Sequence, residues 1–230
     1  MRALLLAAGL GTRLRPLTET VPKCLVPIHG RPLIDYWFDL LLADDIERAL
    51  VNTSHLADRV RDHVAASPWR DRVDLVHEDR LLGTGGTVLA NLPYFGSDSY
   101  LVAHADNLSR FDLRAFLACH EVRPPECAIT MMTFDTDSPQ SCGIVESGAR
   151  GVVVGFHEKV ASPPGRRANG AVYIFDPRVS EFLRALGKPV IDLSTEVLPA
   201  FIGRTATFHN DDYHRDIGTI ESLRAAEREF

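Results

Sequence analysis

Short apolar runs alternate with helical patterns through the first half of the chain. Apolar runs of strand length lie at residues 3–7, 49–53, 73–77, 100–103 and 128–132. Between them lie segments with a helical pattern, at residues 32–44, 56–65, 84–91 and 113–121. Strands that alternate with helices form right-handed βαβ crossovers. The pattern therefore predicts an α/β fold, with a Rossmann-like, mostly parallel sheet that has helices on both faces.

The pattern changes after Cys142. Runs at residues 143–146 and 152–156 flank a glycine-containing turn at residues 147–151, which is typical of a β-hairpin. We therefore expect a small antiparallel excursion here. The remaining expected elements are a loop at residues 163–165, a strand at 171–175 and helices at 179–186 and 219–228.

Composition narrows the class of protein. A chain of 230 residues, 45% hydrophobic and 24% charged, can bury a sizeable core within one domain. Its formal net charge of -6 supplies no overall basic field for nucleic acid. We expect a single domain over residues 1–230 and no nucleic-acid partner.

The cysteines and the N-terminal apolar run indicate the cellular compartment of the protein. The four cysteines include no Cys-x-x-Cys pair and no zinc-type spacing, which favours a reducing cytoplasm. The apolar run at residues 3–7 is too short for a signal peptide or a membrane span. We expect a cytoplasmic protein without a membrane partner. No hexapeptide repeat follows residue 200, so we expect no appended β-helix domain.

The first apolar run leads directly into a loop that contains Gly9 and Gly11. In a parallel sheet, ligands bind beyond the carboxyl ends of the strands. Glycines there let the backbone approach a phosphate closely and point N–H groups at it. Arg13 and Lys23 add two cations that can hold a triphosphate at two points. The loop is therefore predicted to bind an anion.

Other catalytic signatures do not fit this sequence. A dinucleotide-binding loop needs a third glycine where this chain has Leu14, and a Walker loop needs Gly-Lys-Ser/Thr. None of the nine histidines forms His-Glu-x-x-His, and no serine lies in Gly-x-Ser-x-Gly. The sequence therefore does not predict a dehydrogenase, a P-loop enzyme, a zinc hydrolase or a serine hydrolase.

Asp106 is a candidate metal ligand. Asp106 follows the apolar run at residues 100–103, at the sheet edge where chemistry is expected. A hard cation such as Mg²⁺ prefers carboxylate oxygens of this kind. Asp216 precedes the helix expected at residues 219–228. Taken alone, either aspartate could instead cap a helix.

The extended loop string carries a family resemblance. Leu-Ala-Ala-Gly-Leu-Gly-Thr-Arg-Leu-Arg-Pro-Leu-Thr at residues 6–18, with Pro-Lys at 22–23, resembles the signature of the sugar-1-phosphate nucleotidyltransferases. The resemblance implies a GT-A-like fold, with a nucleotide-binding part at about residues 1–110 and a sugar-binding part at about 111–230. It implies the transfer of a nucleoside monophosphate from a nucleoside triphosphate to a sugar 1-phosphate, with Mg²⁺ as cofactor.

Later motifs extend the resemblance over nearly the whole chain. Similar strings are Leu-Gly-Thr-Gly-Gly at 82–86, Ala-Asp at 105–106, Phe-His-Glu-Lys at 156–159, Asn-Gly-Ala-Val-Tyr at 169–173 and Asp-Ile-Gly-Thr at 216–219. The chain departs from the family at His214, where tryptophan is usual, and at Val160, where proline is usual.

The resemblance assigns roles residue by residue. It implies that the nucleotide is bound by Ala7, Ala8, Gly9, Gly11, Thr12, Arg13, Gly83, Thr84 and Gly85. It implies catalytic roles for Arg13, Lys23, Asp106 and Asp216, of which Asp106 and Asp216 would hold Mg²⁺. It implies contacts to the sugar phosphate from Asn107, Gly143, Glu158, Lys159 and Asn169.

The nucleobase and the sugar stay open at this point. The motifs most resemble bacterial guanylyltransferases that act on mannose or heptose 1-phosphates. UTP- or dTTP-dependent enzymes, including those for N-acetylmuramate 1-phosphate, are the alternative, and a cytidylyltransferase is a third. A non-catalytic, nucleotide-sugar-binding regulatory homologue would be free to lose Arg13, Lys23, Asp106 and Asp216, which this chain keeps. The apolar helix faces would also support a homodimer.

Overall fold

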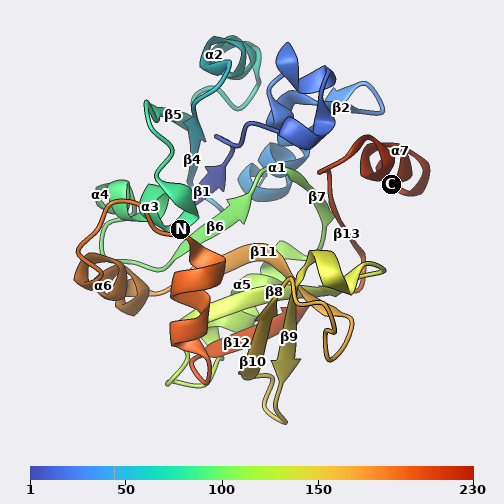
Figure 1. The fold of residues 1–230 in the computed structure, drawn as a ribbon. Coiled ribbons are helices and arrows are strands. Elements are labelled where there is room, and N and C mark those ends of the chain that lie inside the picture. Colours follow the sequence, from blue (N-terminus) through green and yellow to red (C-terminus); the bar gives the residue numbers. More distant parts are fainter. Residues whose placement is uncertain (44) are drawn as a thin grey trace. The chain divides into compact units, whose positions relative to one another are not determined.

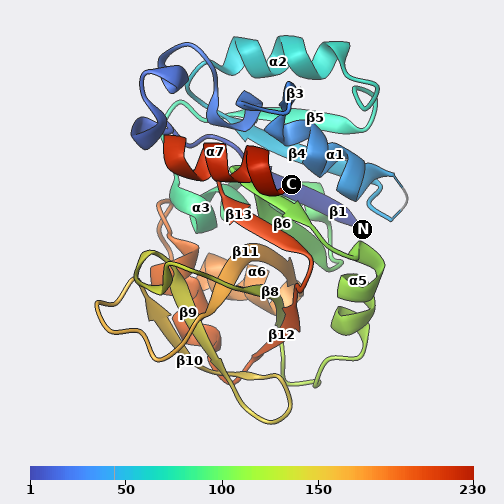
Figure 2. The same cartoon turned by 90° about the vertical axis from the view of Figure 1, so that its right-hand side faces the viewer.

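The computed structural model describes residues 1–43 and 45–230 (Figure 1, Figure 2). These residues group into two compact units. Unit 1 comprises Met1–Leu81, Ala103–Phe111 and Asp212–Phe230. Unit 2 comprises Leu82–Val102 and Asp112–Asp211. Each unit thus combines segments that are distant in the sequence.

Unit 1 is built on parallel strands. Its strands are β1 (Arg2–Leu6), β4 (Arg48–Thr53) and β5 (Val73–His77), and its helices are α1 (Leu33–Leu42), α2 (Ala57–Ala66) and α7 (Ile220–Glu229). Strand β4 pairs in parallel with β1 on one side and with β5 on the other. The predicted strands and helices of this part are confirmed. The expected end of the first helix, at Asp44, lies outside the described residues.

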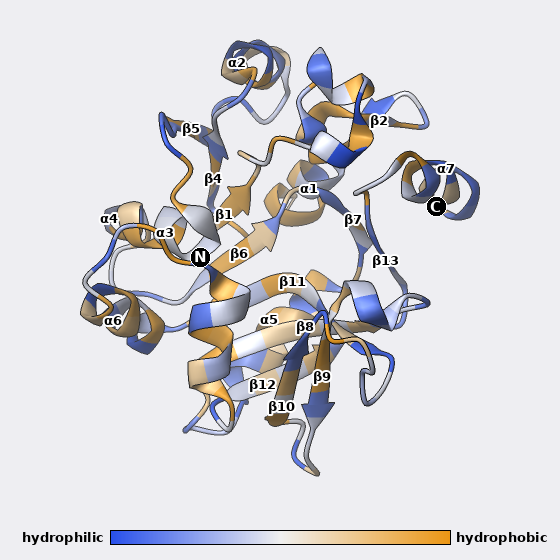
Figure 3. Cartoon of the chain, in the orientation of Figure 1, coloured by the Kyte–Doolittle hydropathy of each residue, from blue (hydrophilic) through white to orange (hydrophobic). Residues whose placement is uncertain are grey.

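Burial explains why these segments form their elements. In β1, Ala3, Leu4 and Leu5 are fully buried. The run is apolar throughout, as in a strand covered on both faces. In α1 the buried residues recur at helical spacing, at Leu33, Ile34, Trp37, Phe38, Leu41 and Leu42. Figure 3 shows the hydrophobic colour along β1 and α1, and more hydrophilic colour along α2.

Several short elements of unit 1 were not predicted. They are the paired strands β2 (Pro27–Ile28) and β3 (Arg31–Pro32), the paired strands β7 (Asn107–Arg110) and β13 (Tyr213–Asp216), and 3-10 helices at Thr12–Leu14, Leu17–Glu19 and Lys23–Leu25. Strand β6 (Tyr100–His104) runs from unit 2 into unit 1. Alternating apolar runs do not identify these elements, because they are short and partly polar.

Unit 2 has a mixed set of strands. They are β8 (Ile129–Asp135), β9 (Gly143–Ser147), β10 (Val153–Glu158), β11 (Arg167–Phe175) and β12 (Thr205–His209). Strands β9 and β10 form the predicted antiparallel hairpin, β8 pairs antiparallel with β11, and β12 adds to β8 in parallel. Strand β12 was not predicted.

The helices of unit 2 complete the α/β fold. They are α3 (Gly83–Ala90), α4 (Leu92–Phe95), α5 (Leu113–Glu121) and α6 (Pro177–Ala185), with shorter helical turns at Pro139–Ser141, Leu193–Val197 and Leu198–Phe201. Asp112 caps α5 and Asp176 caps α6 through their side chains. The predicted α/β fold, with a parallel sheet and an antiparallel excursion, is confirmed.

Candidate functional site

The pairing of β7 with β13 brings two distant aspartates together (Figure 1). The register places Asp216 opposite Asn107, the residue that follows Asp106. The backbone N–H of Ile217 donates to the carbonyl of Asp106 over 3.0 Å. The two carboxylates therefore lie at the same end of this strand pair.

Lys23 lies between the two carboxylates. Its Nζ is 2.6 Å from Oδ2 of Asp106 and 3.4 Å from Oδ1 of Asp216. Nη2 of Arg13 is 3.7 Å from Oδ2 of Asp216. These four residues, Arg13, Lys23, Asp106 and Asp216, are called the charge cluster below. All four catalytic residues implied by the resemblance thus lie together in unit 1.

The charge cluster is shielded from solvent on its lysine side. The Lys23 side chain is only 7% exposed, against 35% for Asp106 and 53% for Asp216. Burial by itself raises the pKa of Asp106, but electrostatic interactions with Lys23 and His104, together with hydrogen bonds from Lys23 and the backbone, leave that pKa below its ordinary value. Asp106 is therefore ionised at neutral pH.

Neither aspartate caps a helix. Asp106 lies in the turn between β6 and β7. Asp216 ends β13, and α7 is capped instead by Thr219, whose hydroxyl accepts from the backbone N–H of Ser222 over 3.1 Å. The alternative interpretation of both aspartates as caps is therefore wrong.

The donor set suits a hard divalent cation. Two carboxylate oxygens, one from each aspartate, already converge on a single cation, the Lys23 ammonium. The described residues contain no group of three or more His, Cys, Asp or Glu side chains with the geometry of a metal site. A Mg²⁺ ion held by this pair would keep coordination positions for water and phosphate oxygens, which is its usual arrangement in phosphoryl-transfer sites.

Gly9 and Gly11 have different surroundings in the loop after β1. Gly11 has φ 61°, and a Cβ there would lie 2.9 Å from Cγ2 of Thr18 and 3.3 Å from Cβ of Lys23. The Thr18 hydroxyl also donates to the Gly11 carbonyl over 2.7 Å. No described heavy atom lies within 4 Å of a Cβ built at Gly9. Gly11 therefore serves packing, whereas Gly9 faces open space.

The loop keeps backbone donors available. No described residue accepts a hydrogen bond from the backbone N–H groups of residues 9–13, which include Thr12 and Arg13. The N–H of Ala7, by contrast, donates to Oδ1 of Asn52 over 2.7 Å. Ala8 is buried beside it. The donors suited to a phosphate are therefore those that begin at Gly9.

Two buried polar residues that were not predicted support this loop. Asn52 donates through Nδ2 to Oε1 of Glu78 over 3.0 Å, while its Oδ1 holds Ala7. Both are buried, at 3% and 6% exposure. A polar residue inside the apolar run at 49–53 is a signal that could have identified Asn52.

Gly218 is a further residue of the site that was not predicted. A Cβ at Gly218 would lie 2.7 Å from Oδ2 of Asp216 and 2.9 Å from Nη2 of Arg13. The backbone at this position therefore lies directly against the charge cluster. The motif Asp-Ile-Gly-Thr contains the residue, but its sequence alone does not show what the glycine touches.

Asn107 contributes to the framework of the site. Its side chain is buried in β7, next to Asp106. Its carbonyl accepts from Nε1 of Trp37 over 2.8 Å, which joins β7 to α1. The implied contact between Asn107 and the sugar phosphate stays a prediction.

The glycine segment at residues 82–86 packs against a loop of unit 2. The N–H groups of Gly85 and Gly86 donate to the carbonyl of Ile191 over 2.9 and 3.1 Å. A Cβ at Gly83, which has φ 73°, would collide with the same carbonyl. Thr84 accepts from the Leu193 N–H over 2.8 Å. Packing therefore explains these glycines, and their contact with a nucleotide stays a prediction.

The predicted sugar-phosphate residues of unit 2 form a second group. Gly143 and Glu158 are opposite each other in the β9–β10 hairpin. A Cβ at Gly143 would lie 2.6 Å from Oε2 of Glu158. Nζ of Lys159 is 3.1 Å from Oε1 of Glu158, and Lys159 itself is exposed. The hairpin thus presents a carboxylate and a lysine side by side.

Asn169 lies in an irregular part of β11. Its Nδ2 donates to the Tyr173 hydroxyl over 2.7 Å, and its Oδ1 accepts from the Ala171 N–H over 2.9 Å. The register with β8 shifts between Asn169 and Tyr173. Burial is the main reason that the pKa of Tyr173 is raised, and the charge of Glu158 adds to it. Tyr173 thus accepts a hydrogen bond from Asn169 and lies within electrostatic range of Glu158.

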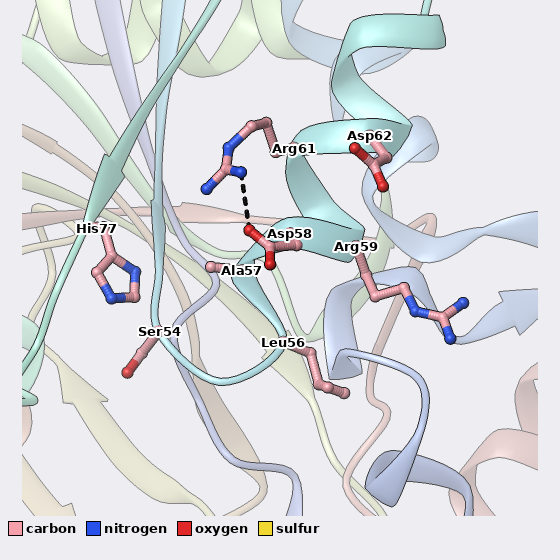
Figure 4. Close-up of a pocket in the computed structure, with 8 residues that line it drawn as sticks. All are labelled: Ser54, Leu56, Ala57, Asp58, Arg59, Arg61, Asp62 and His77. Atoms are coloured by element: carbon pink, nitrogen blue, oxygen red, sulfur yellow. Dashed lines mark ion pairs between the residues drawn. The ribbon is translucent and has the colours of Figure 1, made fainter.

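A separate pocket lies in unit 1 (Figure 4). It has a volume of about 540 Å³ and is lined by Ser54, Leu56, Ala57, Asp58, Arg59, Arg61, Asp62 and His77. Arg61 points to Asp58, and their charged atoms are 2.7 Å apart. The pocket has charges of both signs and shares no residue with the charge cluster.

Comparison with known proteins identifies the family. The sequence profile described as "Nucleotidyl transferase" matches residues 2–230. The chain belongs to this family. Among its relatives is a UTP--glucose-1-phosphate uridylyltransferase of Synechocystis, 28% identical over 96% of this chain and 61% of that protein. Another is a mannose-1-phosphate guanylyltransferase of Mycobacterium tuberculosis, 29% identical over 96% of this chain and 62% of that protein. The chain thus spans less than two thirds of both family members.

A solved structure with a similar fold aligns with the full chain. HddC from Yersinia pseudotuberculosis, in complex with GMP-PN, superposes with a TM-score of 0.81 at 25% identity. The alignment includes 100% of this chain and 99% of HddC. Among the described residues of the present chain, no helix has the length and apolar character needed to cross a membrane.

Proposed function

We propose that this chain is a magnesium-dependent nucleotidyltransferase. It transfers a nucleoside monophosphate from a nucleoside triphosphate to a sugar 1-phosphate and releases pyrophosphate. The observation that carries the proposal is the charge cluster, in which two carboxylates and two cations meet beside a glycine loop. The family of the chain and the names of its relatives support the same reaction.

The reaction needs positioning and charge neutralisation more than a protein nucleophile. The phosphate of the sugar is already ionised, and its oxygen attacks the α-phosphorus in line while pyrophosphate leaves. The free N–H groups of residues 9–13 and the Arg13 guanidinium bind the triphosphate and hold its leaving end. Lys23 pairs with the α-phosphate. Mg²⁺ held by Asp106 and Asp216 would neutralise negative charge on the phosphates.

Unit 2 supplies the sugar-binding residues of the proposal. Glu158, whose side chain is mostly buried, and Asn169 offer a carboxylate and an amide to the sugar hydroxyls. Lys159 is exposed beside Glu158 and pairs with the phosphate of the sugar. Gly143 leaves room for the Glu158 side chain, because a Cβ there would lie 2.6 Å from Oε2 of Glu158.

We assign GTP and a mannose- or heptose-type 1-phosphate as the substrates. The assignment rests on the guanylyltransferase among the relatives and on the guanine nucleotide bound to HddC. The uridylyltransferase among the relatives keeps a UTP enzyme as the competing assignment. The four cysteines are free in the described structure, which agrees with a reducing cytoplasm as its location.

A substrate panel tests the proposal. The purified protein is incubated with GTP, UTP, dTTP or CTP, each with mannose, glucose, heptose or N-acetylmuramate 1-phosphate, and pyrophosphate is measured. We expect release only when a triphosphate, a sugar 1-phosphate and Mg²⁺ are all present, and fastest release with GTP. Absence of release from every pair, while nucleotide binding is retained, would favour a regulatory homologue instead.

A further inference from the structure

Lys23 forms ion pairs with Asp106 and Asp216, the two aspartates that are proposed to hold the metal ion. Its Nζ makes its closest contacts with Oδ2 of Asp106 and Oδ1 of Asp216, at 2.6 and 3.4 Å. A Mg²⁺ ion held by the two aspartates would need their carboxylate oxygens as ligands. Two cations cannot share that space without strong repulsion. The ammonium and the metal ion therefore compete for one position.

We infer that Lys23 is an internal counter-ion that occupies the metal-binding carboxylates and exchanges with the divalent ion when the triphosphate binds. The inference rests on the proposed metal role of Asp106 and Asp216. Lys23 is 7% exposed, so its charge needs an anionic partner at every stage. The α-phosphate provides that partner, and it arrives together with the metal.

The surroundings of Lys23 allow this exchange. The base of its side chain lies close to the Gly11 backbone, since a Cβ at Gly11 would be 3.3 Å from the Cβ of Lys23. The rest of a lysine side chain is a flexible four-carbon stem. The tip can therefore move from the carboxylates to a phosphate at the loop while the backbone stays in place. Nη2 of Arg13, whose side chain is 67% exposed, lies 3.7 Å from the other carboxylate oxygen of Asp216, Oδ2.

Two consequences follow from the competition. A divalent ion alone binds weakly, because it must displace a buried ammonium that has no new partner. Triphosphate and metal bind cooperatively, because each removes an obstacle to the other. Lys23 thus couples metal binding to nucleotide binding and prevents the two carboxylates from repelling each other beforehand.

Mn²⁺ titration followed by electron paramagnetic resonance tests the inference without an activity measurement. We compare the wild-type protein with Lys23→Gln and with Lys188→Gln as the matched control. Lys188 also pairs with a carboxylate, Glu196, but it lies in unit 2, outside the charge cluster. Lys23→Gln is expected to bind Mn²⁺ about tenfold tighter than the wild type or more. Lys188→Gln is expected to match the wild type.

Further variants separate the possible results. Lys23→Arg keeps the charge and should retain the weak affinity of the wild type. The double variant Asp216→Asn with Lys23→Gln should lose the gain in Mn²⁺ affinity. Equal Mn²⁺ affinity in the wild type and Lys23→Gln overturns the inference, as does a Lys23→Gln protein that stays unfolded at saturating Mn²⁺. Mn²⁺-dependent folding of that variant supports it.

The same Mn²⁺ measurements distinguish failure of the proposed exchange from failure of the proposed function. If neither the wild type nor Lys23→Gln binds Mn²⁺, the metal role of the aspartates is wrong. If both bind Mn²⁺ equally well and pyrophosphate is still released, the function stands and only the exchange is refuted.

Discussion

Single glycines illustrate how similar residues serve different purposes at the residue scale. Gly11 is in the left-handed region and in contact with Thr18 and Lys23, whereas Gly9 faces open space. The folded chain requires the first, whereas a role of the second in binding triphosphate belongs to the proposed function. Their spacing in the sequence does not distinguish them.

Alanine at each position should separate the two purposes. Gly9→Ala is expected to change the free energy of unfolding by no more than about 0.5 kcal/mol, since no described atom opposes its methyl group. It should still weaken triphosphate binding, which isothermal titration calorimetry measures. Gly11→Ala should destabilise the chain by about 1–2 kcal/mol in urea unfolding, because of its φ of 61°. Equal effects on stability would contradict this division.

Asp106 provides a catalytic prediction at the same scale. Asp106→Asn keeps the shape of the side chain but removes the charge that faces Lys23 over 2.6 Å. We expect pyrophosphate release to fall by about a hundredfold or more, as for other preorganised electrostatic contacts. The measurement is turnover at saturating substrates, with circular dichroism to check folding. Full turnover in this variant would refute the metal role.

At the scale of elements, the strand pair β7–β13 and helix α7 build the site. Strand β13 carries Asp216, and α7 follows it after a short connection that contains Gly218. Thr219 and Ser222 cap α7 reciprocally through their side chains and backbone N–H groups. The start of this helix therefore fixes the chain shortly after Asp216.

Removal of the cap tests how much the helix contributes. Thr219→Ala should lower the free energy of unfolding by about 1 kcal/mol, because the first turn of α7 loses a hydrogen-bond acceptor. Thr219→Ser keeps the hydroxyl and serves as the control, with a smaller loss. Urea unfolding measures both variants. A loss in Thr219→Ser as large as in Thr219→Ala would show that the methyl group, and not the cap, matters.

At the scale of the whole molecule, two histidines with lowered pKa values contribute to the response to acid. His120 contacts the Thr130 and Ser99 hydroxyls through its two ring nitrogens, at 2.8 and 3.0 Å. Burial lowers the pKa of His120 to about 4 and that of His214 to about 3. Both rings are therefore neutral in the folded protein at neutral pH.

The pH dependence of stability follows from these shifts. Between the ordinary histidine pKa of 6.5 and the folded pKa values of about 4 and 3, the unfolded chain binds more protons than the folded chain. The contribution of these two histidines to the free energy of unfolding is thus complete above about pH 6.5. It falls as the pH decreases, by up to about 1.4 kcal/mol per pH unit for each histidine. Thermal unfolding between pH 7 and 4 measures this slope. His120→Gln should reduce it, and an unchanged slope would exclude His120 as a cause.

The sequence by itself determined most of the regular elements, the glycine loop and the family resemblance. The apolar runs that became β1, β4 and β5, and the helical pattern that became α1, are local signals. These signals predict the elements correctly because the burial of an apolar face produces the same sequence pattern in any α/β fold. The hairpin of β9 and β10 was likewise predicted from the glycine-containing turn between its strands.

Only the tertiary structure decided how distant residues meet. The register of β7 with β13 brings Asp216 to Asp106, and the fold places Lys23 between them. The glycines at 83–86 were explained by their contact with Ile191, which is distant in the chain. Such contacts depend on which segments pack together, and a local pattern of apolar and polar residues contains no information about its partner.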